Sequence, residues 1–235
     1  MTALGYVKDV DWIEELITVP TDEKIIQRWE KLSDFVLKRN HLHIVEPKNR
    51  LAYLPLLKPF FDLVNVAYAP LYGTVDLTEQ QIRKYSAKFA PLINPNTTCF
   101  VMDKNDRMIA FGVGAPSLAV AMQKHRGRLF PTGWIDVLKA FRKNDTVDLL
   151  LIAVHPDYQA RGVNAIILSK TMKGCLKMGI KEAETGPMLE LNDKVQSQWK
   201  DFQTEQHKRR RCFVKELTPA AGEPEKADAP AGAAV

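Results

Sequence analysis

The sequence predicts a mixed α/β fold, of the α+β kind, in which strands and helices alternate along the chain. Three observations indicate this class. Residues 147–154 form an apolar run broken only by Asp148, which is typical of a strand buried on both faces. Residues 97–114 hold two apolar segments around a polar turn, the pattern of a β-hairpin. Residues 21–38 carry apolar side chains at helical spacing.

The composition is that of a soluble globular protein. The chain has 235 residues, 46% hydrophobic and 26% charged, enough for one sizeable domain with extensions. No apolar run reaches the length of a membrane span, and the N-terminus lacks a signal-peptide profile. We therefore expect a cytoplasmic protein without a membrane partner. Cys99, Cys175 and Cys212 are widely spaced, so we expect reduced thiols and neither a disulfide framework nor a zinc site.

A basic cluster, Lys208–Arg211, contributes to the net charge of +5. Such a cluster sometimes binds nucleic acid. This one lacks interleaved aromatic residues, and no helix-turn-helix or zinc-finger spacing accompanies it. We therefore do not expect a nucleic-acid partner, and interpret the cluster as a solvated strand end or a patch that attracts an anionic cofactor.

The N-terminal residues 1–40 are interpreted as a lead-in to the main domain. A short strand is expected over residues 4–12, followed by the helix over 21–38, whose apolar stripe faces a core or, less expectedly, a partner. A short strand over 41–47 places His41 and His43 on one face, as a metal pair requires. No carboxylate or cysteine stands at ligand spacing nearby, so we assign no metal.

The middle of the chain predicts two helices, over residues 50–68 and 77–90, the second opened by a Thr78–Gln81 capping box. After the hairpin comes an insertion, residues 116–144, with helices near 118–123 and 134–142. We interpret this insertion as a lid or specificity element, or as surface decoration.

The C-terminal part continues with a strand over 181–190, interrupted by Gly186-Pro187, then a helix over 193–203. A last strand covers 207–217. The tail, residues 218–235, is rich in proline, alanine and glycine without an apolar anchor, which predicts disorder.

The junction between the central strand and the next helix holds the most specific pattern. His155-Pro156-Asp157 ends the strand, because proline lacks a backbone donor and keeps the preceding residue extended. A glycine turn and a helix start then bring free N–H groups and the positive end of the helix dipole to one place. Such a place suits a phosphate: Gly162 allows close approach of the backbone, and Arg161 adds charge.

The segment from Val154 to Ala165 closely resembles the pyrophosphate-binding segment of the GNAT acetyltransferase superfamily, whose signature is (Gln/Arg)-x-x-Gly-x-(Gly/Ala). Gln159 and Gly162 match, and Asn164 stands where glycine or alanine is usual. The order of expected elements also resembles that of the superfamily, and residues 190–217 are similar to an uncharacterised bacterial subgroup. The alternative interpretation is an ordinary strand–helix junction.

The resemblance implies, for residues 41–217, a GNAT-like mixed, mostly antiparallel sheet with a central splayed strand pair and flanking helices. It implies acetyl-CoA as co-substrate and no metal. The pantetheine arm would pair with the central strand in the gap, and the pyrophosphate would lie on the amides of the turn. The implied cofactor-binding residues are Ile152, Val154, Gln159, Ala160, Arg161, Gly162, Val163, Asn164 and Asn192.

The general acid is where the sequence departs from the superfamily. Its members commonly carry Asn-x-x-Ala-x-x-x-Tyr, with the tyrosine as general acid, and the count from Asn192 reaches Trp199. An indole does not protonate a thiolate. The thiolate therefore leaves unaided, or Tyr158 is the acid, or the domain binds CoA without fast turnover.

The general base is assigned to Glu190, on the strand expected across the gap. Glu182 and Glu184 share its parity and hence its strand face. A water relay and His155 are the alternatives.

The function that the resemblance implies is an acyl-CoA-dependent N-acyltransferase in which an amine attacks the thioester directly. The acceptor is a small-molecule amine or a protein amino group. Asn65, Tyr68 and Tyr72 are candidate substrate contacts, because the corresponding helix pair borders the acceptor pocket in the superfamily. The rival is a non-catalytic CoA-binding or interaction module of the same fold, motivated by Trp199.

Overall fold

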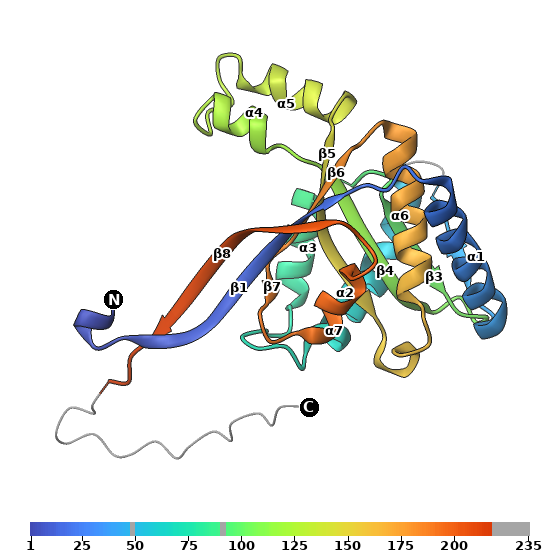
Figure 1. Cartoon of the computed structure of the whole chain (residues 1–235), viewed down its shortest axis with the longest axis horizontal. Helices are drawn as coiled ribbons and strands as arrows, with labels where there is room; N and C mark the ends of the chain where they lie inside the picture. The colour runs from blue at the N-terminus through green and yellow to red at the C-terminus, as the bar shows by residue number, and fades with distance from the viewer. Residues whose placement is uncertain (48–49, 90–92, 218–235) are drawn as a thin grey trace.

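The structure, a computed structural model, describes residues 1–47, 50–89 and 93–217 (Figure 1). The tail predicted over 218–235 lies outside the described residues. In chain order the elements are β1 (Val7–Thr18), α1 (Glu23–Asn40), β2 (His43–Val45), α2 (Leu54–Tyr68), α3 (Glu79–Phe89), β3 (Thr98–Met102), β4 (Met108–Pro116), α4 (Ala119–Lys124), α5 (Gly133–Arg142), β5 (Thr146–Val154), α6 (Asn164–Met178), β6 (Glu182–Thr185), β7 (Met188–Leu189), α7 (Asp193–Gln196) and β8 (Thr204–Val214).

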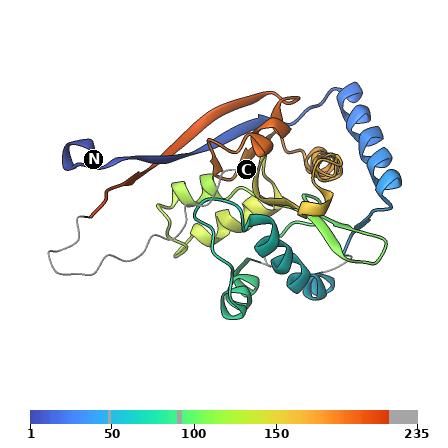
Figure 2. The same ribbon diagram turned by 90° about the horizontal axis from the view of Figure 1, so that it is seen from below.

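The strands form one eight-stranded sheet in the order β2-β3-β4-β5-β6-β1-β7, with β8 paired to β1. The β5–β6 pair is parallel, and the remaining pairs are antiparallel. Helices cover both faces: α1 and α6 lie on one side, α2 and α3 on the other (Figures 1 and 2). The predicted fold class, a mixed and mostly antiparallel sheet with flanking helices, is confirmed.

The alternation of side chains along the strands builds a core on each face. Cys99, Val101 and Ile109 point toward α6, where they meet Ile166 and Ile167. The intervening residues of the same hairpin point toward α2 and pack around Tyr53 and Leu63, namely Phe100, Met102, Met108 and Phe111. The hairpin predicted over 97–114 is thus buried on both faces.

The N-terminal residues, expected as a lead-in, lie inside the sheet. β1 runs over residues 7–18, and pairs with β6 and β7 on one side and with β8 on the other. Its Ile13 and Ile17 share a core with Trp29 of α1 and with Val147 of β5. The division expected at residue 40 therefore falls within one sheet and one core.

Several expected elements differ from the structure. The strand expected over 41–47 covers only His43–Val45, because His41 ends α1 with a left-handed φ of 52° and does not share a strand face with His43. The strand expected over 207–217 runs over Thr204–Val214. β5 is not buried on both faces, because Leu150 is 41% exposed and Leu151 is 37% exposed where β6 no longer runs beside it. The strand expected over 181–190 is broken into β6 and β7 at Gly186-Pro187. The helix expected over 193–203 ends at Gln196 and continues only as a 3-10 turn, Ser197–Trp199.

The two central helices and the insertion agree with their predictions. The capping box forms: Thr78 N–H donates to Gln81 Oε1 at 2.9 Å, and Gln81 N–H donates to Thr78 Oγ1 at 3.3 Å. The insertion contains α4 and α5, which pack against each other. Among the described residues, no helix has the length and apolar character needed to cross a membrane.

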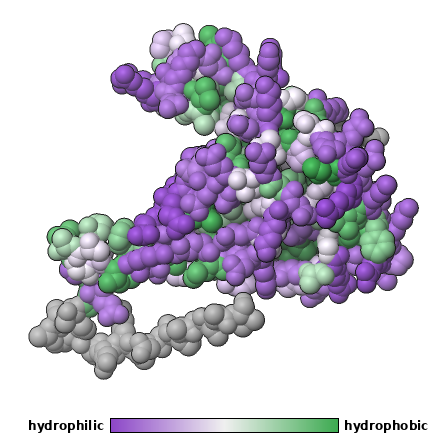
Figure 3. Space-filling model, in the orientation of Figure 1, coloured by the Kyte–Doolittle hydropathy of each residue, from purple (hydrophilic) through white to green (hydrophobic). Residues whose placement is uncertain are grey.

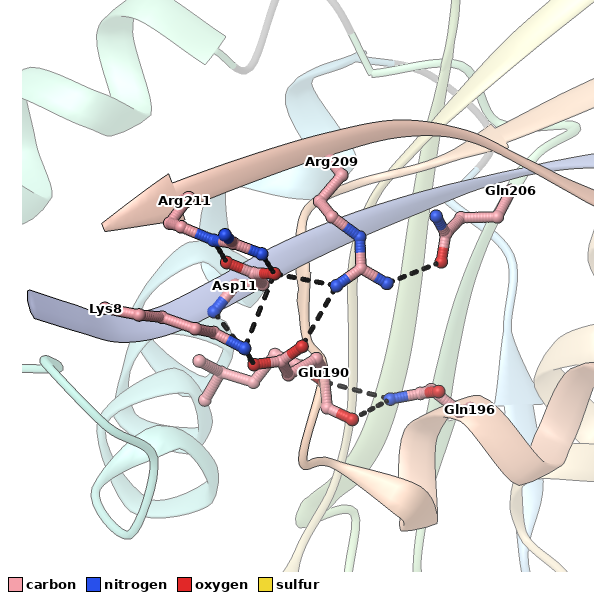
Figure 4. Close-up of polar contacts among 8 residues, drawn as sticks. Lys8, Asp11, Glu190, Gln196, Gln206, Arg209 and Arg211 are labelled. Atoms are coloured by element: carbon pink, nitrogen blue, oxygen red, sulfur yellow. Dashed lines mark hydrogen bonds and ion pairs between the residues drawn. The ribbon is translucent and has the colours of Figure 1, made fainter. Parts of the chain in front are cut away.

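The strand β8 is held on β1 by buried carboxylates. Asp11 is fully buried. Its carboxylate accepts hydrogen bonds from Arg211 Nε at 2.8 Å, from Arg211 Nη2 at 2.9 Å and from Arg209 Nη1 at 2.7 Å (Figure 4). Glu190 closes the group by accepting from Lys8 and from Arg209 Nη1, the latter at 3.0 Å. The guanidinium of Arg211 holds the pKa of Asp11 well below its usual range, against the opposing effect of burial.

The remaining members of the basic cluster are paired in the same way. Arg210 donates to the buried Glu14, and Lys208 pairs with Glu184 and lies 3.4 Å from Glu14 Oε2. The cluster Lys208–Arg211 is therefore neither an unpaired strand end nor an open anion-binding patch, because its cations neutralise internal carboxylates.

We predict that Asp11→Asn lowers the melting temperature, because the change leaves two guanidinium groups beside a neutral buried partner. A carboxyl whose folded pKa is depressed stabilises the fold above its unfolded pKa, and this stabilisation is lost as the pH falls. The deficit of Asp11→Asn against wild type should thus be largest at neutral pH and shrink in acid. Thermal melts across pH check this, with Asp34→Asn on the exposed side of α1 as control; a pH-independent deficit would contradict it.

Candidate functional site

The turn between β5 and α6 presents a row of backbone amides. Ala160 and Gly162 have left-handed backbone angles, with φ of 58° and 78°, which turn successive N–H groups toward one side. Within the described chain, the N–H groups from Ala160 through Asn164 find no acceptor. These amides coincide with the N-terminus of α6, a 15-residue helix, so the helix dipole adds positive potential at the same place. This arrangement has the geometry and potential that suit an anion.

Gly162 is favoured in this turn for two reasons. Its φ of 78° lies in the region that disfavours residues with a side chain. In addition, a Cβ at this position would lie 3.2 Å from Cγ2 of Val36 on α1. The helix α1 therefore supports the turn from behind, and Arg161 adds charge at its rim, where its guanidinium lies 5.1 Å from the ring centre of Tyr158.

A gap between β5 and β6 opens next to this turn. The two strands pair from Thr146↔Glu182 to Leu149↔Thr185 and no further. At the same level a bulge in β5 shifts its register with β4, between the pairs Val113↔Leu151 and Gly114↔Leu149. The implied splayed strand pair is thus present, with its apex at Leu149.

The gap-facing edge of β5 is formed by the main chain of Ile152 and Val154. His155 N–H donates to Ile109 O on β4, so by the alternation of an antiparallel ladder the polar groups of Val154 and Ile152 point away from β4. Their carbonyl oxygens accept from side chains: Ile152 O from Tyr68 Oη at 3.0 Å, and Val154 O from Gln159 Nε2 at 3.3 Å. The expected contact strand and turn therefore lie together, in one continuous edge.

The two expected catalytic residues have other partners. Glu190 belongs to the Asp11 group, where the bond from Lys8 lowers the pKa of its carboxyl and weakens it as a base. Tyr158 Oη donates to Asp103 Oδ2 of the β3–β4 turn at 3.3 Å, and burial raises its pKa. Neither geometry favours the acid–base roles assigned from the sequence, because both side chains are engaged away from the edge of β5.

Asn192 and Trp199 act in local structure. The Asn192 side chain accepts from Val195 N–H at 3.3 Å and so caps α7. Trp199 is buried in the core beside Trp29, and its Nε1 donates to the sulfur of Met188 at 3.4 Å. Trp199, at the position where the sequence pattern led us to look for a tyrosine, is therefore a core residue, and its indole supplies no proton donor to the gap.

The expected substrate contacts divide into two kinds. Asn65 braces the connection from α2 to α3, since its Oδ1 accepts from Leu77 N–H at 2.9 Å. Tyr72 is exposed and donates to Asp9 of β1. Tyr68 alone reaches β5, and burial raises the pKa of its hydroxyl to about 12.

Asp148 is a candidate site residue that sequence reasoning passed over. It lies on β5, one residue before the apex of the gap, and its register partner on β6 is Glu184. Burial raises the pKa of its carboxyl, and the nearby Glu184 and Glu14 raise it further. Of the carboxyl groups in the described chain whose pKa is clearly shifted, Asp148 alone shifts upward. Its position inside an apolar run was the available signal.

One group of possible metal ligands and one cavity lie on other elements than the turn. Among the described residues, Glu14, Glu184 and His207 bring ligand atoms within 4.8 Å of one another, but the ammonium of Lys208 already pairs with both glutamates. A cavity of about 650 Å³ is lined by α7, by the 3-10 turn after it, which includes Trp199, and by Phe202. A second cavity, of about 270 Å³, is lined by residues of α2, by Arg107 and by His155, which precedes the turn. The backbone geometry at β5 and α6 therefore defines the candidate site.

We predict that Asp148→Asn stabilises the fold at neutral pH. A carboxyl whose folded pKa is raised loses stability as the pH rises through its unfolded and then its folded pKa, since the native state must pay for ionisation. The asparagine variant should therefore melt above wild type at neutral pH and equal it in acid, where both side chains are neutral. Equal melting temperatures at all pH values would contradict the upward shift.

The chain was compared with known proteins. No family model matches it. Over 224 residues it is 23% identical to Protein YghO of Escherichia coli (strain K12), a match that covers 91% of this chain and 55% of YghO. The chain thus spans about half the length of this relative.

Solved structures give the fold. A GCN5-related N-acetyltransferase from Sphaerobacter thermophilus matches with a TM-score of 0.55 at 9% identity, over 91% of this chain and 53% of that protein. A tandem GNAT protein from the clavulanic acid biosynthesis pathway matches with a TM-score of 0.52 at 9% identity, over 93% and 57%. The chain has the fold of the GCN5-related N-acetyltransferases.

Proposed function

We propose that the chain binds an acyl-CoA, acetyl-CoA by default, and transfers the acyl group to an amine. The observation that carries this proposal is the run of amides from Ala160 to Asn164, placed at the end of the free edge of β5. The run of amides suits a diphosphate, and the edge of β5 without a strand partner suits an extended chain that carries amide groups. Coenzyme A contains both, joined in that order.

The position of the acyl group follows from the direction of β5. The amide row lies at the carboxyl end of this strand, so an arm that starts there runs back along Val154 and Ile152 toward Leu149. Its reactive end then lies by the apex of the gap, lined by the half-exposed Leu150 and Leu151. Asp148 is the next residue along the strand.

The transfer requires one bond to form and one to break. The amine nitrogen bonds to the thioester carbon, the carbon–sulfur bond breaks, and the nitrogen loses a proton. Asp148 accepts this proton, directly or through a water, because its raised pKa makes it the better base of the two carboxylates nearest the apex. The thiolate takes its proton from solvent.

Tyr68 contributes a hydroxyl at the gap-facing edge of β5. It donates to Ile152 O, and its pKa of about 12 keeps it protonated at neutral pH. It therefore holds the strand edge and acts as a hydrogen-bond donor, without acting as the acid. The acceptor is a small-molecule amine or a protein amino group.

The rival function, a CoA-binding module without turnover, draws support from Trp199, which is committed to the core. Both functions require the amide row, but only the enzyme requires Asp148. Two measurements separate them.

The first measurement is calorimetric titration with acetyl-CoA. Gly162→Asp should weaken binding at least about tenfold, because it adds a negative charge at the anion site and a side chain against Val36. Gly179→Asp is the matched control: it lies at the other end of α6, has φ of 71°, and its Cβ meets open space. It should bind like wild type. Equal affinities of Gly162→Asp and wild type would overturn the proposed cofactor site.

The second measurement is release of free thiol from acetyl-CoA over a panel of amines. On any amine that wild type acylates, Asp148→Asn should lower kcat about a hundredfold, the usual contribution of a general base, while leaving acetyl-CoA affinity unchanged. Wild type that binds acetyl-CoA but releases no thiol with any amine would favour the binding module. Full activity of Asp148→Asn would remove the base assignment.

A further inference from the structure

The insertion forms a projecting arm, defined here as residues 117–144. It stands away from the body of the protein at the start of β5 (Figure 1). In Figure 3 hydrophobic and hydrophilic surfaces lie side by side on it. Large apolar side chains are exposed along its length: Phe130 81%, Val120 79%, Leu138 53%, with Leu129, Trp134 and Ile135 also exposed.

The tip of the arm, residues 125–132, is fixed by its own contacts. Asp136 of α5 accepts from Lys124 Nζ and pairs with His125 Nε2, both at 2.7 Å, which ties α5 to the end of α4. The Lys124 ammonium holds the pKa of Asp136 well below its usual range. The ion pair of Lys124 with Asp136 is therefore present throughout the neutral range, and it joins the two helices of the arm.

Backbone contacts complete the tip. Gly133 approaches Arg128 so closely that a Cβ there would lie 2.1 Å from Arg128 O. Trp134 N–H donates to Leu129 O at 2.9 Å, and its indole Nε1 donates to Pro131 O at 3.0 Å. The exposure of Leu129 and Phe130 thus belongs to an ordered turn. Apolar side chains held in water by an ordered turn mark an interaction site.

The charge of the arm is strongly positive. Its residues include six lysines and arginines and one aspartate. That aspartate, Asp136, is already shared by Lys124, His125 and Lys139. Within the described residues, the side chains of Arg126, Arg128, Arg142 and Lys143 have no partner. Two of these arginines, Arg126 and Arg128, directly precede the exposed Leu129 and Phe130 of the tip.

We propose that the arm attaches the protein to the surface of a membrane that contains anionic lipid. Exposed phenylalanine, tryptophan and leucine next to lysine and arginine are the composition of an interfacial anchor. The surface is a projection and not a groove, so its apolar side chains can enter a headgroup layer while the arginines meet the phosphates. The sequence led us to expect no membrane partner because it lacks a spanning segment, and surface attachment requires none.

The test is flotation of the full chain with vesicles of phosphatidylcholine, alone or mixed equally with phosphatidylglycerol. Wild type should float with the mixed vesicles at low salt, release as salt is added, and bind pure phosphatidylcholine weakly. Replacing Leu129 and Phe130 by serine should weaken binding at least about tenfold. Replacing Arg126 and Arg128 by glutamine should weaken it roughly thirtyfold, at about 1 kcal/mol for each arginine.

Matched variants distinguish a specific membrane-binding site at the tip from nonspecific adsorption of the protein to vesicles. Val75→Ser with Leu191→Ser removes two highly exposed apolar side chains elsewhere, and Lys31→Gln with Lys38→Gln removes two exposed cations of α1. Both should float like wild type. The proposal is overturned if wild type does not float, if the tip variants bind like wild type, or if control and tip variants lose binding equally. It is also overturned if the arm instead joins two copies of the chain, seen as a dimer that the Leu129 and Phe130 variant abolishes.

Discussion

The parting of β5 from β6 at Leu149 is the constraint on which the candidate site depends. Where two parallel strands stop pairing, the backbone groups of the facing edges need other partners, and each strand depends on its other neighbour for its position. β4 pairs with β5 along the whole of its length, past the apex to Val154. The bulge near Leu150 adds twist where the strands diverge. The edge therefore stays open and rigid, and leads directly to the amide row of α6.

The opposite wall of the gap is secured by charge. β6 and β7 are short, so their position depends on β1, and β1 is fixed in turn by β8. Burying Asp11 and Glu14 is costly in isolation, but three arginines and two lysines surround them and Glu190. These ion pairs lie along the antiparallel pair of β1 and β8, and they hold β8 at the edge of the sheet. The basic cluster Lys208–Arg211, which the sequence suggested to be a solvated surface feature, thus helps to hold the fold together.

Local patterns in the sequence were sufficient for most elements and for the glycine turn between β5 and α6. The hairpin, the Thr78 cap and the β5–α6 junction depend on neighbours within a few residues, so their signals are complete in the sequence. The place of β1 depends on β6 and β8, more than 160 residues away, and no local pattern encodes such a pairing. The same holds for Glu190 and for Lys208–Arg211, whose roles depend on partners in β1 and β6. The base was assigned to Glu190 on the assumption that residues 181–190 form one continuous strand with alternating faces. Gly186-Pro187 breaks that strand, so the alternation does not extend to Glu190.

Glu190 and Asp148, the two carboxylates considered for proton transfer, show how the surroundings of a carboxylate set its pKa and hence its strength as a base. Glu190 is surrounded by cations, which lower its pKa and stabilise the charge that a base must give up. Asp148 is half-buried beside two glutamates, so its ionised form is disfavoured and its affinity for a proton is higher. A sheet that brings carboxylates of adjacent strands into register, as it does Asp148 and Glu184, produces this difference without any added ligand. Asp148, the base that we propose, lies one residue before the apex of the gap, in register with Glu184 on the opposite strand.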